Sequence, residues 1–246
     1  VAEEFNMTTD LDRWVVRNVI AWHRRKRQRT PHWRSAMYSL NLFSSSMLDR
    51  NFTADVGRLF GPVMLVYFLA IAAMVGIGVV SLWWFGQPLT CTCGSVSLWV
   101  GDINSSQNSQ QVADPYSFTH ISHGLLFFGL LWPLRRRVDA GTRLVLATAV
   151  EVAWEIVENS PLVIERYREA TISLGYRGDS VLNSTSDVLM CVIGFALASR
   201  LPGRLSAALI VASEVVLALT IRDGLLINVV MLLYPVPALR DWQLAR

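Results

Sequence analysis

Charged side chains are scarce in this sequence. Aspartate, glutamate, lysine and arginine make up 17% of the 246 residues, whereas soluble domains carry about 25%. Lysine occurs once, as Lys26, and no charged side chain occurs from Phe60 to Val100. That gap exceeds the roughly 20 apolar residues that cross a bilayer core. The scarcity of charge therefore excludes an ordinary soluble domain and indicates an integral membrane protein.

Cysteine is also rare, with three residues in the chain. Cys91 and Cys93 fall in a segment that we expect to be exported, where oxidation can occur. A disulfide between them would close a very small ring, which disfavours the pair. Cys191 lies within a predicted span, where we interpret it as a small packing residue.

The sequence lacks the period-2 pattern of a transmembrane barrel. Lipid offers backbone groups no hydrogen-bond partner, so helices are the default. We predict an all-α, polytopic transmembrane bundle of five or six helices over residues 59–246, with an exported loop at about 86–116. Besides the stretch that starts at Phe60, the candidate spans are Ser117–Leu134, Leu144–Ile164, Val181–Ser199, Leu205–Ile221 and the shorter Gly224–Leu239.

Arginine is unevenly distributed along the chain and predicts the orientation. Residues 1–58 carry 10 of the 22 lysines and arginines. The positive-inside rule places this N-terminus in the cytoplasm of a bacterial inner membrane, and six spans would place the C-terminus there too. The basic run has no accompanying recognition fold, so we expect no nucleic-acid partner. Four arginines are expected on the exported side: Arg166, Arg168, Arg177 and Arg222.

Residues 1–58 form a polar, basic leader. Its segment from Leu11 to Trp22 places apolar side chains on one helical face, followed directly by the basic run RRKRQR. This pattern suits an amphipathic helix that lies on an anionic membrane surface. A solvated basic run that only fixes topology is the alternative. The candidate residues for docking on the membrane or a partner are Trp14, Trp22, Arg24, Arg25, Lys26 and Arg27.

Polar side chains recur at helical spacing in three neighbouring spans. His120 and His123 are three residues apart, and three glutamates stand at i, i+4 and i+7. Asp179, Asn183 and Asp187 follow at i, i+4 and i+8. A charge at the bilayer centre costs about 3 kcal/mol, so these stripes should face a shared interior. The predicted intramembrane polar site is His120, His123, Glu151, Glu155, Glu158, Asn183 and Asp187.

Several interpretations of this interior remain open. Two histidines with carboxylates suit a divalent zinc, iron or manganese ion, although di-iron bundles use Glu-x-x-His rather than His-x-x-His. The polar groups could instead join the helices by hydrogen bonds. Proton or ion transport lacks an inverted-repeat pattern. An axial histidine for a haem or chlorophyll-type pigment would find room beside Ser122 and Gly124. The candidate metal ligands are His120, His123, Glu155, Glu158 and Asp187.

Three segments carry a resemblance to a known family: DPYSFTHISHG, WEIVENSP and YRGDSVLNSTSD. The chain resembles a bacterial family of multi-pass inner-membrane proteins of unknown function, in which PYSFxHxxHG, WExxENSP and GDSxxNSxxD recur in this order. The resemblance covers roughly residues 60–246 and implies location and topology, with no activity attached. A weaker likeness is to VanZ-like membrane proteins, which also place His, Glu and Asp on successive spans. The long leader departs from the family's shorter start.

Two functions follow as hypotheses. In the first, the chain is a non-catalytic accessory or scaffold subunit of a larger membrane complex, such as a respiratory or photosynthetic one, and its leader docks on lipid or on other subunits. In the second, it is a metal-dependent membrane enzyme that acts on a lipid or lipid-linked substrate. His120 and His123 would then be ligands or acid–base groups, and Glu155, Glu158 and Asp187 ligands or bases.

Overall fold

A computed structural model describes residues 61–245, and no strand occurs among them. The all-α prediction is therefore confirmed for this part of the chain. The predicted leader, with its interfacial helix and its docking residues, lies outside the described residues.

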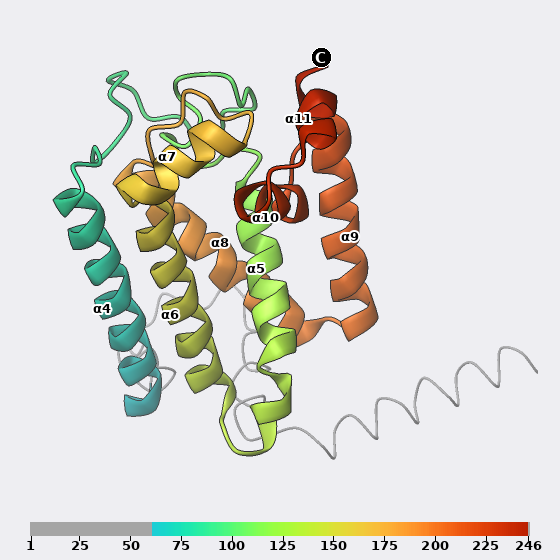
Figure 1. Ribbon diagram of the computed structural model, residues 1–246. Helices are drawn as coiled ribbons and strands as arrows, with labels where there is room; N and C mark the ends of the chain where they lie inside the picture. Colours follow the sequence, from blue (N-terminus) through green and yellow to red (C-terminus); the bar gives the residue numbers. More distant parts are fainter. Residues whose placement is uncertain (1–60, 246) are drawn as a thin grey trace, which may run out of the picture. The chain divides into compact units, whose positions relative to one another are not determined.

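Among residues 61–245, five long helices run up and down beside one another, and three short helices gather at one end of this bundle (Figure 1). The loop that follows the first long helix lies at the same end (Figure 1). The long helices are α4 (Pro62–Trp84), α5 (Ser117–Leu130), α6 (Ala140–Glu158), α8 (Val181–Arg200) and α9 (Gly203–Thr220). The short elements are the 3₁₀ helix η2 (Trp132–Arg136) and the helices α7 (Pro161–Ala170), α10 (Leu225–Leu233) and α11 (Pro237–Leu244).

Three of the described helices are long and apolar enough to cross a membrane: Val63–Trp84, Val181–Arg200 and Gly203–Thr220. Helix α5 has only 14 residues, and α6 carries an arginine and three glutamates. The predicted count of five or six spans is therefore not confirmed. These three apolar helices are compatible with a membrane protein.

The predicted span Leu144–Ile164 is interrupted. Helix α6 ends at Glu158, and Ser160 starts α7 by accepting a hydrogen bond from the backbone N–H of Val163. Pro161 is the first residue of α7, where its fixed φ and missing N–H favour a helix start over continuation of the preceding helix. The apolar residues after Pro161 thus belong to a short helix at the end of the bundle.

The predicted sixth span, Gly224–Leu239, does not form. Its residues divide between α10, of nine residues, and α11. Nine residues extend about 14 Å, less than half of a bilayer core of about 30 Å. Pro235 and Pro237 separate the two helices, because proline cannot continue α10. The last described residues therefore lie at the same end of the bundle as the loop after α4, instead of at the opposite end (Figure 1).

The position of α11 also changes how the arginines divide between the two ends of the bundle, because it places Arg240 at the loop end. One end of the described bundle carries Arg135, Arg136, Arg137, Arg143, Arg200 and Arg204. The other end carries Arg166, Arg168, Arg177, Arg222 and Arg240. These two sets are nearly equal, so the charge bias depends on residues 1–58. The cytoplasmic N-terminus stays a prediction.

Helices α5 and α8 cross in close contact at two glycines. A Cβ atom on Gly124 would overlap the backbone of Cys191, and one on Gly194 would overlap the backbone of Ile121. Small residues allow such close approach of membrane helices. Ser122, one residue from the crossing, contacts Ser213 of α9 at 3.1 Å between hydroxyl oxygens. The space that we expected beside Ser122 and Gly124 for a pigment ring is filled by α8 and α9.

The loop after α4 is fastened to the start of α8. The backbone N–H of Ser180 donates to the carbonyl of Ser109, and that of Val181 donates to the carbonyl of Pro88. The loop also contains a disulfide between Cys91 and Cys93, a pair that ring size had disfavoured in the sequence. The loop is thus a fixed cover over this end of the bundle.

Helix α10 is held at both ends. The carboxylate of Glu214, in α9, accepts hydrogen bonds from the backbone N–H groups of Leu225 (3.0 Å) and Leu226 (2.9 Å). These N–H groups have no partner within a helix. At the other end, Nε of Arg166 donates to the carbonyl of Leu232 at 2.9 Å. These hydrogen bonds explain why a carboxylate, Glu214, occurs within the apolar helix α9.

The glycine crossing gives a testable prediction. Gly194→Ala should lower the stability of the purified protein by about 1–3 kcal/mol, because the added methyl group forces α5 and α8 apart. Gly129→Ala is the matched control, since a Cβ there meets no atom within 4 Å. Thermal unfolding in detergent measures both variants. Equal midpoints for Gly194→Ala and Gly129→Ala would contradict the close crossing.

Candidate functional site

Two histidines of α5 converge on one glutamate of α6. Nδ1 of His120 lies 2.6 Å from Oε1 of Glu151, and Nδ1 of His123 lies 3.0 Å from Oε2 of the same carboxylate. Glu151 is fully buried, with 0% of its surface exposed. The i, i+3 spacing of the histidines on α5 brings both rings to this side chain. Glu151 belongs to the predicted polar site but not to the predicted metal ligands.

Glu155, one turn further along α6, has no hydrogen-bond partner. Its Oε1 lies 3.4 Å from Nδ1 of His120, but neither carboxylate oxygen makes a hydrogen bond. The residue is 1% exposed. A buried carboxylate without a hydrogen-bond partner is costly, so this position favours either a protonated carboxyl group or a nearby cation.

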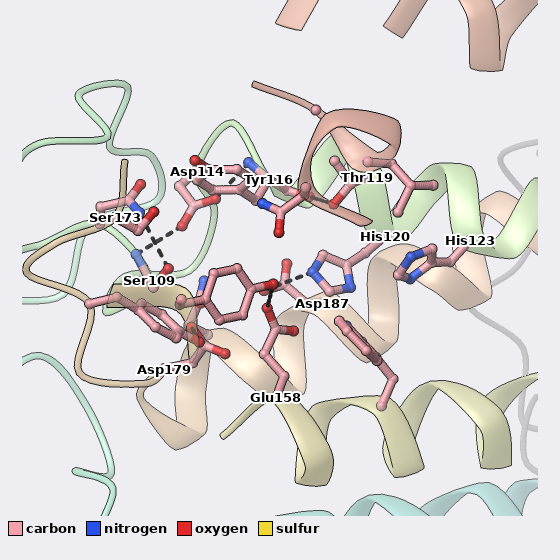
Figure 2. Close-up of a pocket in the computed structure, with 18 of the residues that line it drawn as sticks. Ser109, Asp114, Tyr116, Thr119, His120, His123, Glu158, Ser173, Asp179 and Asp187 are labelled. Atoms are coloured by element: carbon pink, nitrogen blue, oxygen red, sulfur yellow. Dashed lines mark hydrogen bonds and ion pairs between the residues drawn. The ribbon is translucent and has the colours of Figure 1, made fainter. Parts of the chain in front are cut away.

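Asp187 of α8 lies on the opposite side of the His120 ring. Its Oδ2 is 3.9 Å from Nε2 of His120, and the hydroxyl of Ser117 donates to its Oδ1 at 3.1 Å. Figure 2 shows His120 pointing into the space between Asp187 and Glu158. His120 thus has carboxylates near both of its ring nitrogens.

Glu158 and Asn183 lie nearer the loop end of the bundle. The hydroxyl of Tyr167 donates to Oε1 of Glu158 at 2.7 Å. Nδ2 of Asn183 donates to the carbonyl of Gln111 at 3.0 Å, so this amide fastens the loop after α4. The structure therefore brings all seven predicted site residues to one region but gives Asn183 a bond to the loop backbone.

A cavity of about 70 Å³, measured as the space open to the centre of a water molecule, is lined by five of these residues: His120, His123, Glu158, Asn183 and Asp187. Glu151 and Glu155 do not line it. At about 10–15 Å³ for each water, it has room for several water molecules. Histidines, carboxylates and tyrosines line it, among them His120, Glu158 and Tyr116 (Figure 2). Apolar side chains line it as well: Trp154 of α6, and Leu225, Val229 and Leu232 of α10.

Asp179 lines the end of the cavity nearest the loop. Helix α8 begins only after Ser180, so Asp179 does not continue the helical stripe that we predicted with Asn183 and Asp187. Its carboxylate accepts hydrogen bonds from Nδ2 of Asn159 (2.8 Å) and from the hydroxyl of Tyr176 (3.0 Å). Burial raises the pKa of Asp179 to about 6, against the lowering effect of these two hydrogen bonds.

Two further acids adjoin the cavity. Asp114 accepts hydrogen bonds from the backbone N–H groups of Ser109 (2.9 Å) and Tyr116 (2.8 Å), and burial raises its pKa. Asp223 accepts the hydroxyl of Tyr116 at 2.9 Å. Burial raises the pKa of Asp223 to about 6, against the lowering effect of the hydrogen bonds from Gly224 and Tyr116.

Sequence reasoning missed several residues of this end of the cavity. Asp114 and Tyr116 precede the histidines within DPYSFTHISHG, a segment that carried the family resemblance, so a signal was present. Asp223 falls between the predicted spans Leu205–Ile221 and Gly224–Leu239, so it was not a candidate for the site. Tyr176 opens YRGDSVLNSTSD, another segment of the resemblance, so a signal was present there too. Tyr167 carries no signal in the sequence, because only the turn at Pro161 brings α7 over the cavity.

Two groups of side chains could hold a metal ion. The first comprises His120, His123 and Glu151, and the second comprises His120, Glu155 and Glu158. Within each group the ligand atoms all lie within 4.8 Å of one another. Neutral imidazole and carboxylate oxygen suit zinc, manganese and iron. Asp187 belongs to neither group, although we predicted it as a ligand.

The raised pKa of Asp179 predicts a pH dependence of stability. Between its ordinary pKa of 3.8 and about 6, the folded protein holds a proton that the unfolded chain releases. The free energy of unfolding should therefore fall as pH rises through this window. The shift of about 2 units corresponds to at most about 3 kcal/mol.

Thermal unfolding in detergent between pH 4 and pH 7 measures this effect. The midpoint of Asp179→Asn should fall less with pH than that of the unchanged protein. Asp241→Asn, an exposed acid of α11, should leave the slope unaltered. Parallel slopes for Asp179→Asn and the unchanged protein would show that Asp179 ionises normally.

Comparisons with known proteins identify relatives in several bacteria. The chain is 52% identical to a UPF0314 protein of Paracoccus denitrificans over 176 residues, which cover 71% of this chain and 91% of the relative. It is 49% identical to a UPF0314 protein of Sphingopyxis alaskensis over 184 residues, covering 74% and 97%. A UPF0314 protein of Sinorhizobium fredii is 47% identical over 178 residues, covering 72% and 90%.

No solved structure matches the chain. Residues 82–245 match a family described as protein of unknown function (DUF2585). The match begins near the end of α4 and includes both histidines and all the carboxylates of the site. The resemblance predicted from the three segments is confirmed: this chain belongs to the DUF2585 family, together with the bacterial UPF0314 proteins.

Proposed function

We propose that this chain is an integral protein of the bacterial inner membrane that binds a divalent cation and uses it in chemistry on a lipid or lipid-linked substrate. The observation that carries the proposal is Glu155, a buried carboxylate without a hydrogen-bond partner beside His120. A cation held by the neighbouring ligands would compensate this charge.

The ligands we assign are His120, His123 and Glu151. Their ligand atoms lie within 4.8 Å of one another, and both histidines present Nδ1 to the glutamate. Nε2 of His120 faces Asp187. A carboxylate on the second ring nitrogen orients a metal-bound histidine and fixes its tautomer. Glu155 would stand beside the cation as a fourth donor, the second carboxylate of the set.

The cavity supplies the place for a reaction. A bound divalent cation lowers the pKa of a coordinated water towards neutrality. Glu158 lines the cavity and belongs with His120 and Glu155 to the second group of ligand-distance side chains. We assign Glu158 as the base that would accept a proton from such a water, so the reaction class is metal-assisted hydrolysis.

The apolar wall of the cavity supports a substrate with a lipid tail. Val229 of α10 lines the cavity and is also 40% exposed, so apolar surface continues from the cavity to the outside of the bundle. Trp154 of α6 also lines the cavity. The described residues include three apolar helices long enough to span a membrane. A ligand with a polar head and an apolar tail suits a cavity with both polar and apolar lining.

The accessory-subunit hypothesis depends on the basic leader, with residues from Trp14 to Arg27, and on partners among other membrane proteins. The leader lies outside the described residues, so this hypothesis stays a prediction. Purification from native membranes tests it: a stoichiometric complex that depends on residues 1–58 would support it.

Metal analysis tests the proposed ion. Protein purified without chelator should hold about one zinc, manganese or iron ion per chain, measured by elemental mass spectrometry. His123→Ala should lower the occupancy at least tenfold because it removes one ligand. Glu165→Ala, an exposed glutamate of α7, should retain the ion.

A second measurement separates loss of the ion from loss of folding. In EDTA the unchanged protein should unfold at a lower temperature, because Glu155 is then uncompensated. Glu155→Leu should unfold at a higher temperature than the unchanged protein in EDTA, since the buried charge is gone. The proposal fails if the unchanged protein carries no metal and its unfolding midpoint ignores added zinc, manganese and iron.

Lipid chemistry is tested by incubating the metal-loaded protein with a total bacterial phospholipid extract. Mass spectrometry should show hydrolysis of one lipid class, at least tenfold slower for Glu158→Gln, which keeps the size of the side chain but removes the base. If the extract stays unchanged over many hours, the protein does not hydrolyse these lipids, and only the metal-binding part of the proposal remains.

A further inference from the structure

We propose that the end of the cavity nearest the loop after α4 binds the primary ammonium headgroup of a phospholipid. The inference names the ligand class for the lipid-facing site proposed above. It rests on that lipid-facing role but not on the metal ion, which would occupy the histidine end.

The charge of the cavity wall favours a cation. Four carboxylates line it, and none of the described residues lining it is lysine or arginine; the carboxylates are Asp114, Glu158, Asp179 and Asp187. Clefts lined by one sign of charge concentrate ligands of the opposite sign. An anionic headgroup without an ammonium would meet only repulsion at this end.

Two unmatched acceptors point to a ligand that donates hydrogen bonds. Oδ1 of Asn108 and Oδ1 of Asn228 are buried and have no partner, and both side chains line the cavity. Buried polar atoms in proteins are generally paired. A primary ammonium has three N–H donors, whereas a quaternary ammonium has none. The two asparagines therefore favour a primary amine.

Tyrosines surround the same end. The rings of Tyr167 and Tyr176 lie 5.0 Å apart at 63°, and their hydroxyls donate to Glu158 and Asp179. These bonds fix the rings in place at the cavity wall. Cations bind favourably to tyrosine faces, with about 0.5–2 kcal/mol per contact. Fixed rings and carboxylates together form a preorganised ammonium site.

The apolar side chains that line the cavity favour a lipid over a free amine as the ligand. The side chains of Trp154, Val229 and Leu232 line the cavity, and a small soluble amine would leave this surface without contact. Acyl carbons of a phospholipid would cover it, at about 25 cal/mol for each Å² removed from water. The phosphate, between head and tail, would face the histidine end.

Lipid binding to the purified full-length protein in detergent tests the inference. The probes are short-chain phosphatidylethanolamine, phosphatidylcholine and phosphatidylglycerol with the same acyl chains, and ethanolamine alone. Binding is followed by the shift of the thermal unfolding midpoint. We expect phosphatidylethanolamine to bind at least tenfold more tightly than the other three probes.

Variants locate the binding. Asp179→Asn and Asn228→Leu should each weaken phosphatidylethanolamine binding at least fivefold, and Glu165→Gln on the exposed face of α7 should leave it unchanged. If Asp179→Asn fails to fold, Asn228→Leu replaces it in the test. The Asn228 side chain donates only one weak hydrogen bond, of 3.4 Å, to Asp223, so its loss should leave folding intact.

The outcomes are distinguishable. Equal affinity for phosphatidylethanolamine and phosphatidylglycerol would overturn the inference, as would ethanolamine binding as tightly as the lipid. Unchanged affinity in Asn228→Leu would overturn it as well. Phosphatidylethanolamine binding should persist in His123→Ala and in EDTA. If the unchanged protein contains no metal but still binds phosphatidylethanolamine, the metal site is rejected and the headgroup site is retained.

Discussion

The burial of Glu151 between two histidines is the contact on which the site depends. A fully buried carboxylate is tolerated only with close partners, and His120 and His123 supply them from the adjacent helix. This contact fixes how α5 is turned about its axis relative to α6. The glycine crossing then places α8 against α5, so Asp187 reaches the other nitrogen of His120. The contacts that form the site are therefore also contacts that pack α5, α6 and α8 together.

Much of this arrangement follows from the sequence. Carboxylates and histidines at helical spacing in apolar segments had to face inward, and they do, because lipid offers no alternative partner. Which carboxylate contacts the histidines could not be predicted. Spacing gives the face of a helix, but the depth of Glu151 relative to His120 is set by where α5 and α6 begin, and that depends on the turn between them.

The errors concern the places where helices stop. Apolar composition suggested continuous spans through Pro161 and Pro235, whereas the structure ends a helix near each of them. These breaks produce α7 and α10, and those short helices complete the cavity with Tyr167, Asn228 and Val229. Residues that enter a site because a helix is broken carry no periodic signal. This is why Tyr167, Asn228 and Val229 were not predicted.

The glycine crossing also restricts how the protein can deform. At Gly124 and Gly194 the backbones of α5 and α8 touch with no intervening side chain, so we expect these two helices to move as a single body. Helix α10, by contrast, is a short helix held by a carboxylate of α9 and a guanidinium of α7. We therefore expect the cavity to enlarge by movement of α10, with α5 and α8 as the stationary frame.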